Sequence, residues 1–178
     1  MFDPRTIFLV PMHWWNETAV GVDMRASSVL IALVQSVHLL GLTMFAGTLL
    51  LVNLRMMGIG FVRQPLDKMA RELEPWTRLG IAISLASGIL MLSSEARKCY
   101  EASFFWLKMI LLVTALGFHF TVRRRWVRTD IHMPSSGTRG VACISLLLWL
   151  GVAISGKMIG IYGDDLRTEK DPFALAAK

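Results

Sequence analysis

Four apolar segments, each long enough to cross a lipid bilayer, occupy most of this 178-residue chain. An α-helix rises about 1.5 Å per residue and the hydrocarbon core of a bilayer is about 30 Å thick, so about 20 residues span it. Backbone amides inside lipid must pair within their own segment, which favours helices. The segments are Ser28–Leu54, Trp76–Ala96, Ser103–Val122 and Gly140–Gly160. They predict an all-α fold, a polytopic four-helix bundle in a membrane.

Composition agrees with this assignment and divides the chain into three parts. Hydrophobic residues make up 54% of the sequence, and the mean hydropathy of +0.51 is high for a soluble domain. The start of the chain lacks a basic region and a small-residue cleavage site, so we expect no cleaved signal peptide. Residues 1–27 contain Trp14 and Trp15, which suit the headgroup zone, and we expect them to lie on the outer surface. Residues 28–160 form the transmembrane domain, and the polar residues 161–178 form an external tail.

The distribution of basic residues predicts the orientation in the membrane. Four lie between the first and second segments, with Arg78 just inside the second, and five lie between the third and fourth. Two lie between the second and third segments and two before the first. Because basic loops stay in the cytoplasm, both termini should face outside, as in a multi-pass protein of the bacterial inner membrane. The net charge of +6 therefore indicates topology, and Arg123–Arg125 are expected to anchor the third segment, with no role in binding nucleic acid.

Two further patterns concern packing. Between Pro65 and Pro75, apolar residues recur at helical spacing, which predicts a short amphipathic helix on the cytoplasmic surface that connects two spans or docks a partner. In the second span, Gly80, Ser84 and Gly88 are spaced four apart. Small residues on one stripe allow a neighbouring helix to approach closely, within the bundle or across a dimer.

Ionisable groups inside the spans are costly in lipid and are therefore the candidates for function. His38 lies about 15 Å into the first span, too deep to reach the surface easily. Its imidazole suits haem iron, copper or zinc, and the alternative is a hydrogen bond to a Ser or Thr of another helix. Lys108 enters the third span from the outside, where it could pair with Glu95 or a haem propionate, or extend to the headgroups.

A second axial ligand is less well defined by the sequence. His119 lies near the inner surface and roughly 9–19 Å from the level of His38, which disfavours one haem shared by both histidines. Met91 and Met158 fall in the outer half with His38, where a thioether could complete a haem or copper site, although most methionines only fill space. No nucleophile–base pair, phosphate loop or zinc spacing is apparent, so no catalytic residue is assigned. Cys99, expected in the outer loop, and Cys143 should be too far apart to form a disulfide.

Three motifs give the chain a family resemblance over about residues 25–125. HLLGLTMFAGTLLLVNLRMMGIG (38–60), EPWTRLGIAISLASGILMLSSEA (74–96) and FFWLKMILL (104–112) resemble a family of small bacterial four-helix membrane proteins of uncharacterised function. That family has Asp where this chain has Asn53, and often has Asn late in the third span, where this chain has Phe118 and His119.

A second, looser resemblance concerns the histidine of an early span and the lysine that opens a later one. This pattern is similar to the copper-resistance D membrane domain and to the haem-binding protoporphyrinogen oxidase membrane family. The resemblance implies a b-type haem, or alternatively copper, on the bundle axis, with His38 and Lys108 at the matching positions. Two functions follow as hypotheses: a haem-binding electron-transfer protein, or a non-catalytic accessory subunit that stabilises a larger membrane complex.

Overall fold

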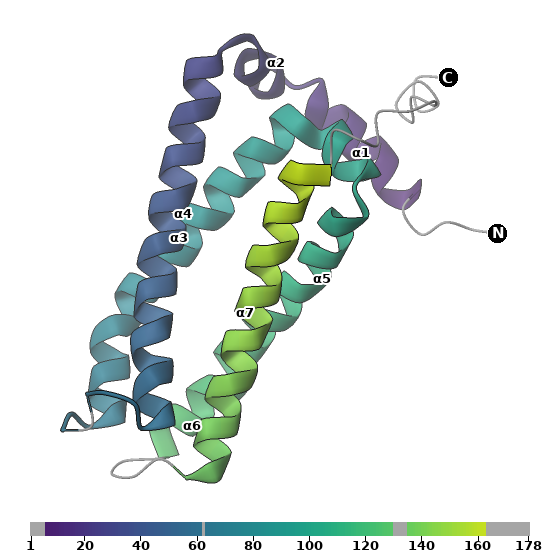
Figure 1. Cartoon of the computed structure of the whole chain (residues 1–178). Helices are drawn as coiled ribbons and strands as arrows, with labels where there is room; N and C mark the ends of the chain where they lie inside the picture. Colours follow the sequence, from purple (N-terminus) through teal and green to yellow (C-terminus); the bar gives the residue numbers. More distant parts are fainter. Residues whose placement is uncertain (1–5, 62, 130–134, 163–178) are drawn as a thin grey trace.

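The computed structural model describes residues 6–61, 63–129 and 135–162, which are helical apart from short connections (Figure 1). No strand occurs in these ranges, and the all-α prediction is confirmed. The elements, in chain order, are α1 (Thr6–Asn16), α2 (Ala19–Ala26), α3 (Ser28–Met57), α4 (Leu66–Glu101), α5 (Ser103–Phe118), the π-helical turn η1 (His119–Arg123), α6 (Arg124–Thr129) and α7 (Ser136–Tyr162).

Four helical runs are long and apolar enough to cross a membrane, as the sequence predicts. They are Ser28–Met57, Leu66–Ala96, Ser103–Val127 and Ser136–Ile161, of 25 to 31 residues each. Most of their side chains are not buried inside the protein, which suits helices whose outer faces contact lipid. The protein is therefore a multi-pass helical membrane protein, and a lipid bilayer is its environment.

The ends of α3 are set by local sequence. The Ser27 hydroxyl accepts a hydrogen bond from the Leu30 amide at 3.3 Å and so caps the first turn. At the other end Gly58 adopts a left-handed conformation (φ 79°), and its amide bonds back to the last turn. Glycine adopts this conformation without the steric cost that a Cβ would bring, so the helix ends here.

Helices α3 and α4 pack in close contact along the predicted stripe of small residues. A Cβ added to Gly80 would lie 2.7 Å from the Phe45 amide nitrogen, and one added to Gly41 would lie 2.9 Å from Ser84 Oγ. Gly88 faces the ring of His38: a Cβ added to Gly88 would lie 3.3 Å from His38 Cε1. The stripe thus serves packing within the bundle, and the prediction of close approach is confirmed.

The pair α3 and α4 contacts the pair α5 and α7 mainly near the end of the bundle where α3 ends and α4 begins. We call this the arginine-rich end, because Arg55, Arg63 and Arg71 lie there. Phe45 packs edge-on against Trp149 with ring centroids 4.4 Å apart, and Val52 and Met56 pack against Val141 and Ala142. Farther from this end α3 is much more open: Val29 is 76% exposed and Leu40 68%.

The expected separate linker helix is instead the first part of α4. The helix runs from Leu66 through Pro75 without a break, so the prediction of an independent surface helix that ends at Pro75 is wrong. The physical reason is that its apolar face is buried: Leu66 and Met69 are 2% and 6% exposed. Ion pairs from Asp67 to Arg71 and from Glu74 to Arg78, each one turn apart, line its polar face.

The expected loop between the second and third spans is also largely helical. α4 continues to Glu101, and non-helical backbone angles at Glu95 (φ −124°, ψ 27°) mark a kink. Cys99 consequently lies in a helix and packs against Ala102 and Phe105, and it is not in an exposed outer loop as expected. Neither Cys99 nor Cys143 forms a disulfide.

Short helices α1 and α2 lie at the end of the bundle opposite the arginine-rich end, where both contact α4 (Figure 1). Arg25 ties them to α4: its guanidinium donates to Asn16 Oδ1 at 2.8 Å and to the Ser93 carbonyl at 3.3 Å. Gly21 is equally close, since a Cβ there would lie 2.8 Å from the same carbonyl oxygen. Residues 6–26 therefore form a helical cap on this end. Of the predicted tail, residues 163–178 lie outside the described part of the chain.

Candidate functional site

The first candidate site surrounds His38 and is called the outer histidine site; it comprises His38, Ser87 and Lys108. His38 Nδ1 lies 2.9 Å from Ser87 Oγ. The Ser87 hydroxyl has one proton, which it donates to the backbone carbonyl of Ile83 at 2.6 Å. With the Ser87 proton on Ile83, Ser87 accepts from His38; in this tautomer Nδ1 carries the ring proton and Nε2 keeps its lone pair. That is the arrangement of a histidine whose Nε2 binds a metal while Nδ1 is held by a partner.

Lys108 reaches the same region from α5. Its ammonium acts electrostatically on His38, and Nζ lies 3.5 Å from where a Cβ of Gly156 would be. The lysine stem therefore lies over a glycine of α7, where no side chain competes for the space. Glu95, the acidic partner that the sequence suggests, is exposed. His38 on α3 and Lys108 on α5 thus lie within electrostatic range of each other.

The two candidate methionines are placed differently. Both Met91 and Met158 are partly buried. Met91 lies one turn beyond Ser87 on the same face of α4, whereas Met158 is two residues past Gly156 and so points roughly 200° away from it. Met91 is thus better placed than Met158 to approach His38. Among the described residues, no three His, Cys, Asp or Glu side chains are grouped so that they could hold a metal ion.

A second polar site, which the sequence analysis did not single out, lies at the arginine-rich end. We call it the inner polar pocket, formed around Asn53, Glu74, His119 and Arg123. Arg123 is 7% exposed, and its Nε donates to Asn53 Oδ1 at 3.2 Å. Asn53 is fully buried and donates in turn to Ser145 Oγ on α7 at 3.3 Å. These bonds join α3, η1 and α7 through side chains that hydrocarbon would otherwise strongly disfavour.

A π-helical turn places two of these groups together. His119 and Arg123 begin and end η1, both are 7% exposed, and Arg123 Nη1 lies 3.4 Å from His119 Nδ1. A guanidinium has only donors, so His119 Nδ1 accepts this bond and Nε2 carries the ring proton. Single π-helical turns within α-helices are rare and occur frequently at functional sites.

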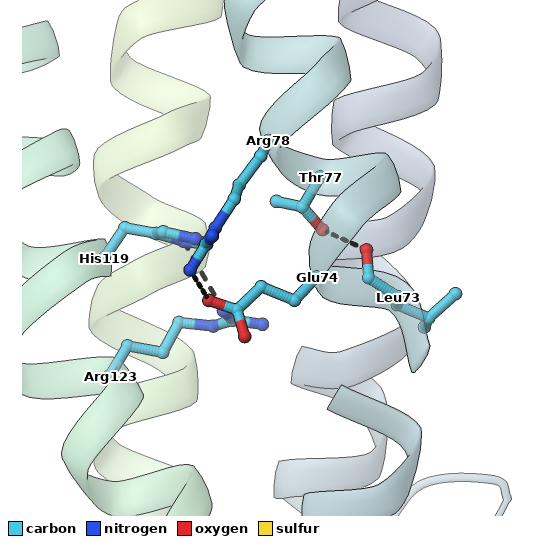
Figure 2. Close-up of polar contacts among 6 residues, drawn as sticks. All are labelled: Leu73, Glu74, Thr77, Arg78, His119 and Arg123. Carbon is cyan, nitrogen blue, oxygen red and sulfur yellow. Dashed lines mark hydrogen bonds and ion pairs between the residues drawn. The ribbon is translucent and has the colours of Figure 1, made fainter. Parts of the chain in front are cut away.

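Glu74 faces this pair from α4. Figure 2 shows its carboxylate extending toward Arg123 and His119, while Arg78, one turn along α4, binds the same carboxylate. The carboxylate acts electrostatically on both His119 and Arg123. A cavity of about 320 Å³ opens between these helices, a volume that accepts a small ligand. Its polar lining comes from Asp67, Arg71, Glu74, Thr77, His119 and Arg123.

Sequence reasoning missed this pocket because each member had a simpler interpretation. Arg123 is buried, whereas the sequence analysis assigned it with Arg125 to a surface anchor; only Arg125 of the two is exposed. His119 was expected near the inner surface, away from the level of His38. One signal was available, since a histidine and an arginine four residues apart lie on one helical face. What pairs them with Asn53 and Glu74 is tertiary packing, which spacing alone does not reveal.

These helices and the polar groups between them define a multi-pass membrane protein with two separate clusters of partly or fully buried ionisable side chains. The chain belongs to a family of unknown function, DUF6644, whose sequence profile matches residues 12–162. The match covers all four membrane-spanning helices, α2 and the last turns of α1. No curated protein and no solved structure matches the chain. The copper-resistance D and protoporphyrinogen oxidase families are not among the findings, and the similarity to them stays a prediction.

Proposed function

We propose that this membrane protein binds one b-type haem through His38 Nε2 and serves in electron transfer. The observation that carries the proposal is the bond from His38 Nδ1 to Ser87, whose own proton is committed to Ile83. In the tautomer that donates through Nδ1, this bond fixes the ring and Nε2 keeps the lone pair. An intramembrane histidine with that tautomer is equipped to be an axial ligand.

The residues around His38 fit such a group in two further respects. Gly88 lies beside the imidazole ring and Gly156 beside the Lys108 ammonium, so neither position adds a side chain to the region. Lys108 provides a cation in electrostatic reach of His38, suited to a propionate. A bound haem b would supply one-electron redox chemistry. The protein would hold the imidazole, pair the carboxylate and exclude water.

Copper is the alternative occupant, with His38 and the thioether of Met91 as ligands of suitable softness. The same experiment separates the two. Full-length protein purified from cells supplied with haem should show a Soret band and, on reduction with dithionite, the sharpened visible bands of a b-type cytochrome. Elemental analysis should give about one iron per chain and no stoichiometric copper. If the purified protein contains neither iron nor copper at a stoichiometric level, the proposal of a cofactor at this site is refuted.

A second candidate, an accessory subunit of a larger membrane complex, is supported by Gln35. This amide is exposed on the open part of α3, where lipid cannot satisfy its hydrogen bonds. A partner helix would satisfy them. A photo-crosslinking amino acid at position 35 should then capture a discrete partner, whereas the same probe at Val113, 71% exposed on α5, should not. If the probes at positions 35 and 113 give the same products and neither captures a discrete protein, lipid is the neighbour at both positions. That result would exclude an accessory role for the α3 surface.

A further inference from the structure

The inner polar pocket has the construction of an oxyanion site. Its two basic members, His119 and Arg123, are each 7% exposed and project from the same π-helical turn. Both side chains reach toward the cavity from η1 (Figure 2). Because His119 Nδ1 accepts from Arg123, its Nε2–H remains a donor. A guanidinium and an imidazole N–H side by side are the donors that phosphate and carboxylate oxygens require.

Arg123 shares the Glu74 carboxylate with Arg78. Arg71 pairs with Asp67 at 2.7 Å. Among the described residues, Arg123 donates to Asn53 and His119, which are neutral acceptors in these bonds. The carboxylate that acts on Arg123 is Glu74, and Arg78 binds that same carboxylate at the protein surface. Glu74 therefore has a second cation available if another anion takes its place.

We propose that the inner polar pocket binds a phosphate group, which pairs with Arg123 and His119 while Glu74 stays with Arg78. The cavity of about 320 Å³ is large enough for phosphate or for a small molecule that carries it. Asn53 acts as a positioning residue: it holds Arg123 Nε, so that the remaining guanidinium edge faces the cavity. The source of the phosphate is either a free anion or the headgroup of a lipid, and the site is independent of any cofactor at His38.

Calorimetric titration of inorganic phosphate into the full-length protein in neutral detergent tests the proposal. Wild-type protein should bind saturably. Arg123→Gln should weaken binding by about tenfold or more, since the charged donor is lost. Arg139→Gln is the matched control, because Arg139 is exposed at the same end of the bundle and does not line the cavity. Binding in that variant should be unchanged.

Glu74→Gln guards against the case in which Arg123→Gln fails to fold. Removing the competing carboxylate should tighten phosphate binding by about threefold or more, since like charges no longer oppose each other. A second arm compares the thermal stability of the protein in nanodiscs of phosphatidylglycerol and of phosphatidylcholine. If phosphatidylglycerol stabilises the wild-type protein but not Arg123→Gln, and free phosphate does not bind, then the source of the phosphate is a lipid headgroup. If neither probe depends on Arg123, or if Glu74→Gln weakens binding, the proposal is wrong.

Discussion

The hydrogen-bond partners of the two intramembrane histidines favour opposite tautomers. His38 donates through Nδ1 to Ser87, whose proton goes to Ile83, and so keeps a lone pair on Nε2. His119 accepts at Nδ1 from Arg123 and so keeps a proton on Nε2. The first is equipped to ligate a metal and the second to donate to an anion. This difference separates the functions proposed for the two sites.

Ser87→Ala tests the tautomer argument at His38. Without the hydroxyl, Nδ1 loses the partner that fixes the ring, and such losses typically weaken metal affinity by about 10–100-fold. We expect faster haem release, measured by transfer of haem to apomyoglobin. Ser36→Ala is the control, since the Ser36 hydroxyl is exposed and bonds only to its own helix at the Ala32 carbonyl. Equal haem release from both variants would remove Ser87 from the site.

Asn53 gives a prediction about stability at the inner polar pocket. Asn53→Leu leaves Arg123 Nε without its acceptor in a fully buried position, which should cost about 1–3 kcal/mol of unfolding free energy. Asn53→Asp supplies a charged acceptor for the same N–H and should retain wild-type stability or raise it. Thermal unfolding in detergent, followed by tryptophan fluorescence, measures both. A more stable Asn53→Leu variant would mean that the bond to Arg123 contributes nothing.

At the scale of single helices, length and hydropathy were enough to predict four spans, and residue spacing was enough to predict the Gly80, Ser84 and Gly88 stripe. Two boundaries were not predictable. Pro65 and Pro75 suggest an isolated segment, but burial of Leu66 and Met69 keeps this part of α4 packed on the bundle. The end of α4 likewise extends past the expected loop, because its apolar residues pack on the start of α5.

Two glycines of the membrane helices provide a matched test of the α3–α4 contact. A Cβ at Gly80 would lie 2.7 Å from the Phe45 nitrogen, whereas one at Gly47 would meet nothing within 4 Å. Gly80→Ala must therefore push two helices apart, and its melting temperature should fall by several degrees. Gly47→Ala should be neutral or stabilising by up to about 1 kcal/mol, since alanine favours a helix. Equal melting temperatures would contradict the close approach.

For the whole molecule, the polar sites were only half predictable. His38 and Lys108 stand out because they are ionisable groups in apolar surroundings, and the fold does bring them into electrostatic reach. The residues of the inner polar pocket come from α3, α4 and η1, and Asn53 adds a partner on α7; these segments look unrelated in sequence. Asn53 and Ser145 are 92 positions apart, yet their side chains share a hydrogen bond. Only the packing of α3, α4, η1 and α7 creates that site.

Orientation in the membrane is the prediction that belongs to the molecule as a whole. Cys99 is only 9% exposed and is a poor reporter, so both native cysteines should first be replaced by alanine. In that background, Glu17→Cys and Arg63→Cys place exposed thiols at opposite ends of the bundle. A membrane-impermeant maleimide should label position 17 in intact cells and position 63 only after permeabilisation. The reverse pattern would invert the topology.

The central claim, that His38 holds a haem, is tested most directly by comparing two histidine variants. His38→Ala and His119→Ala each remove one imidazole from a membrane helix, at two different sites. Absorption spectra of the purified proteins, oxidised and then reduced, should show the Soret band lost in His38→Ala and retained in wild type and His119→Ala. A Soret band that survives in His38→Ala, or one that is absent from wild-type protein supplied with haem, would contradict the claim.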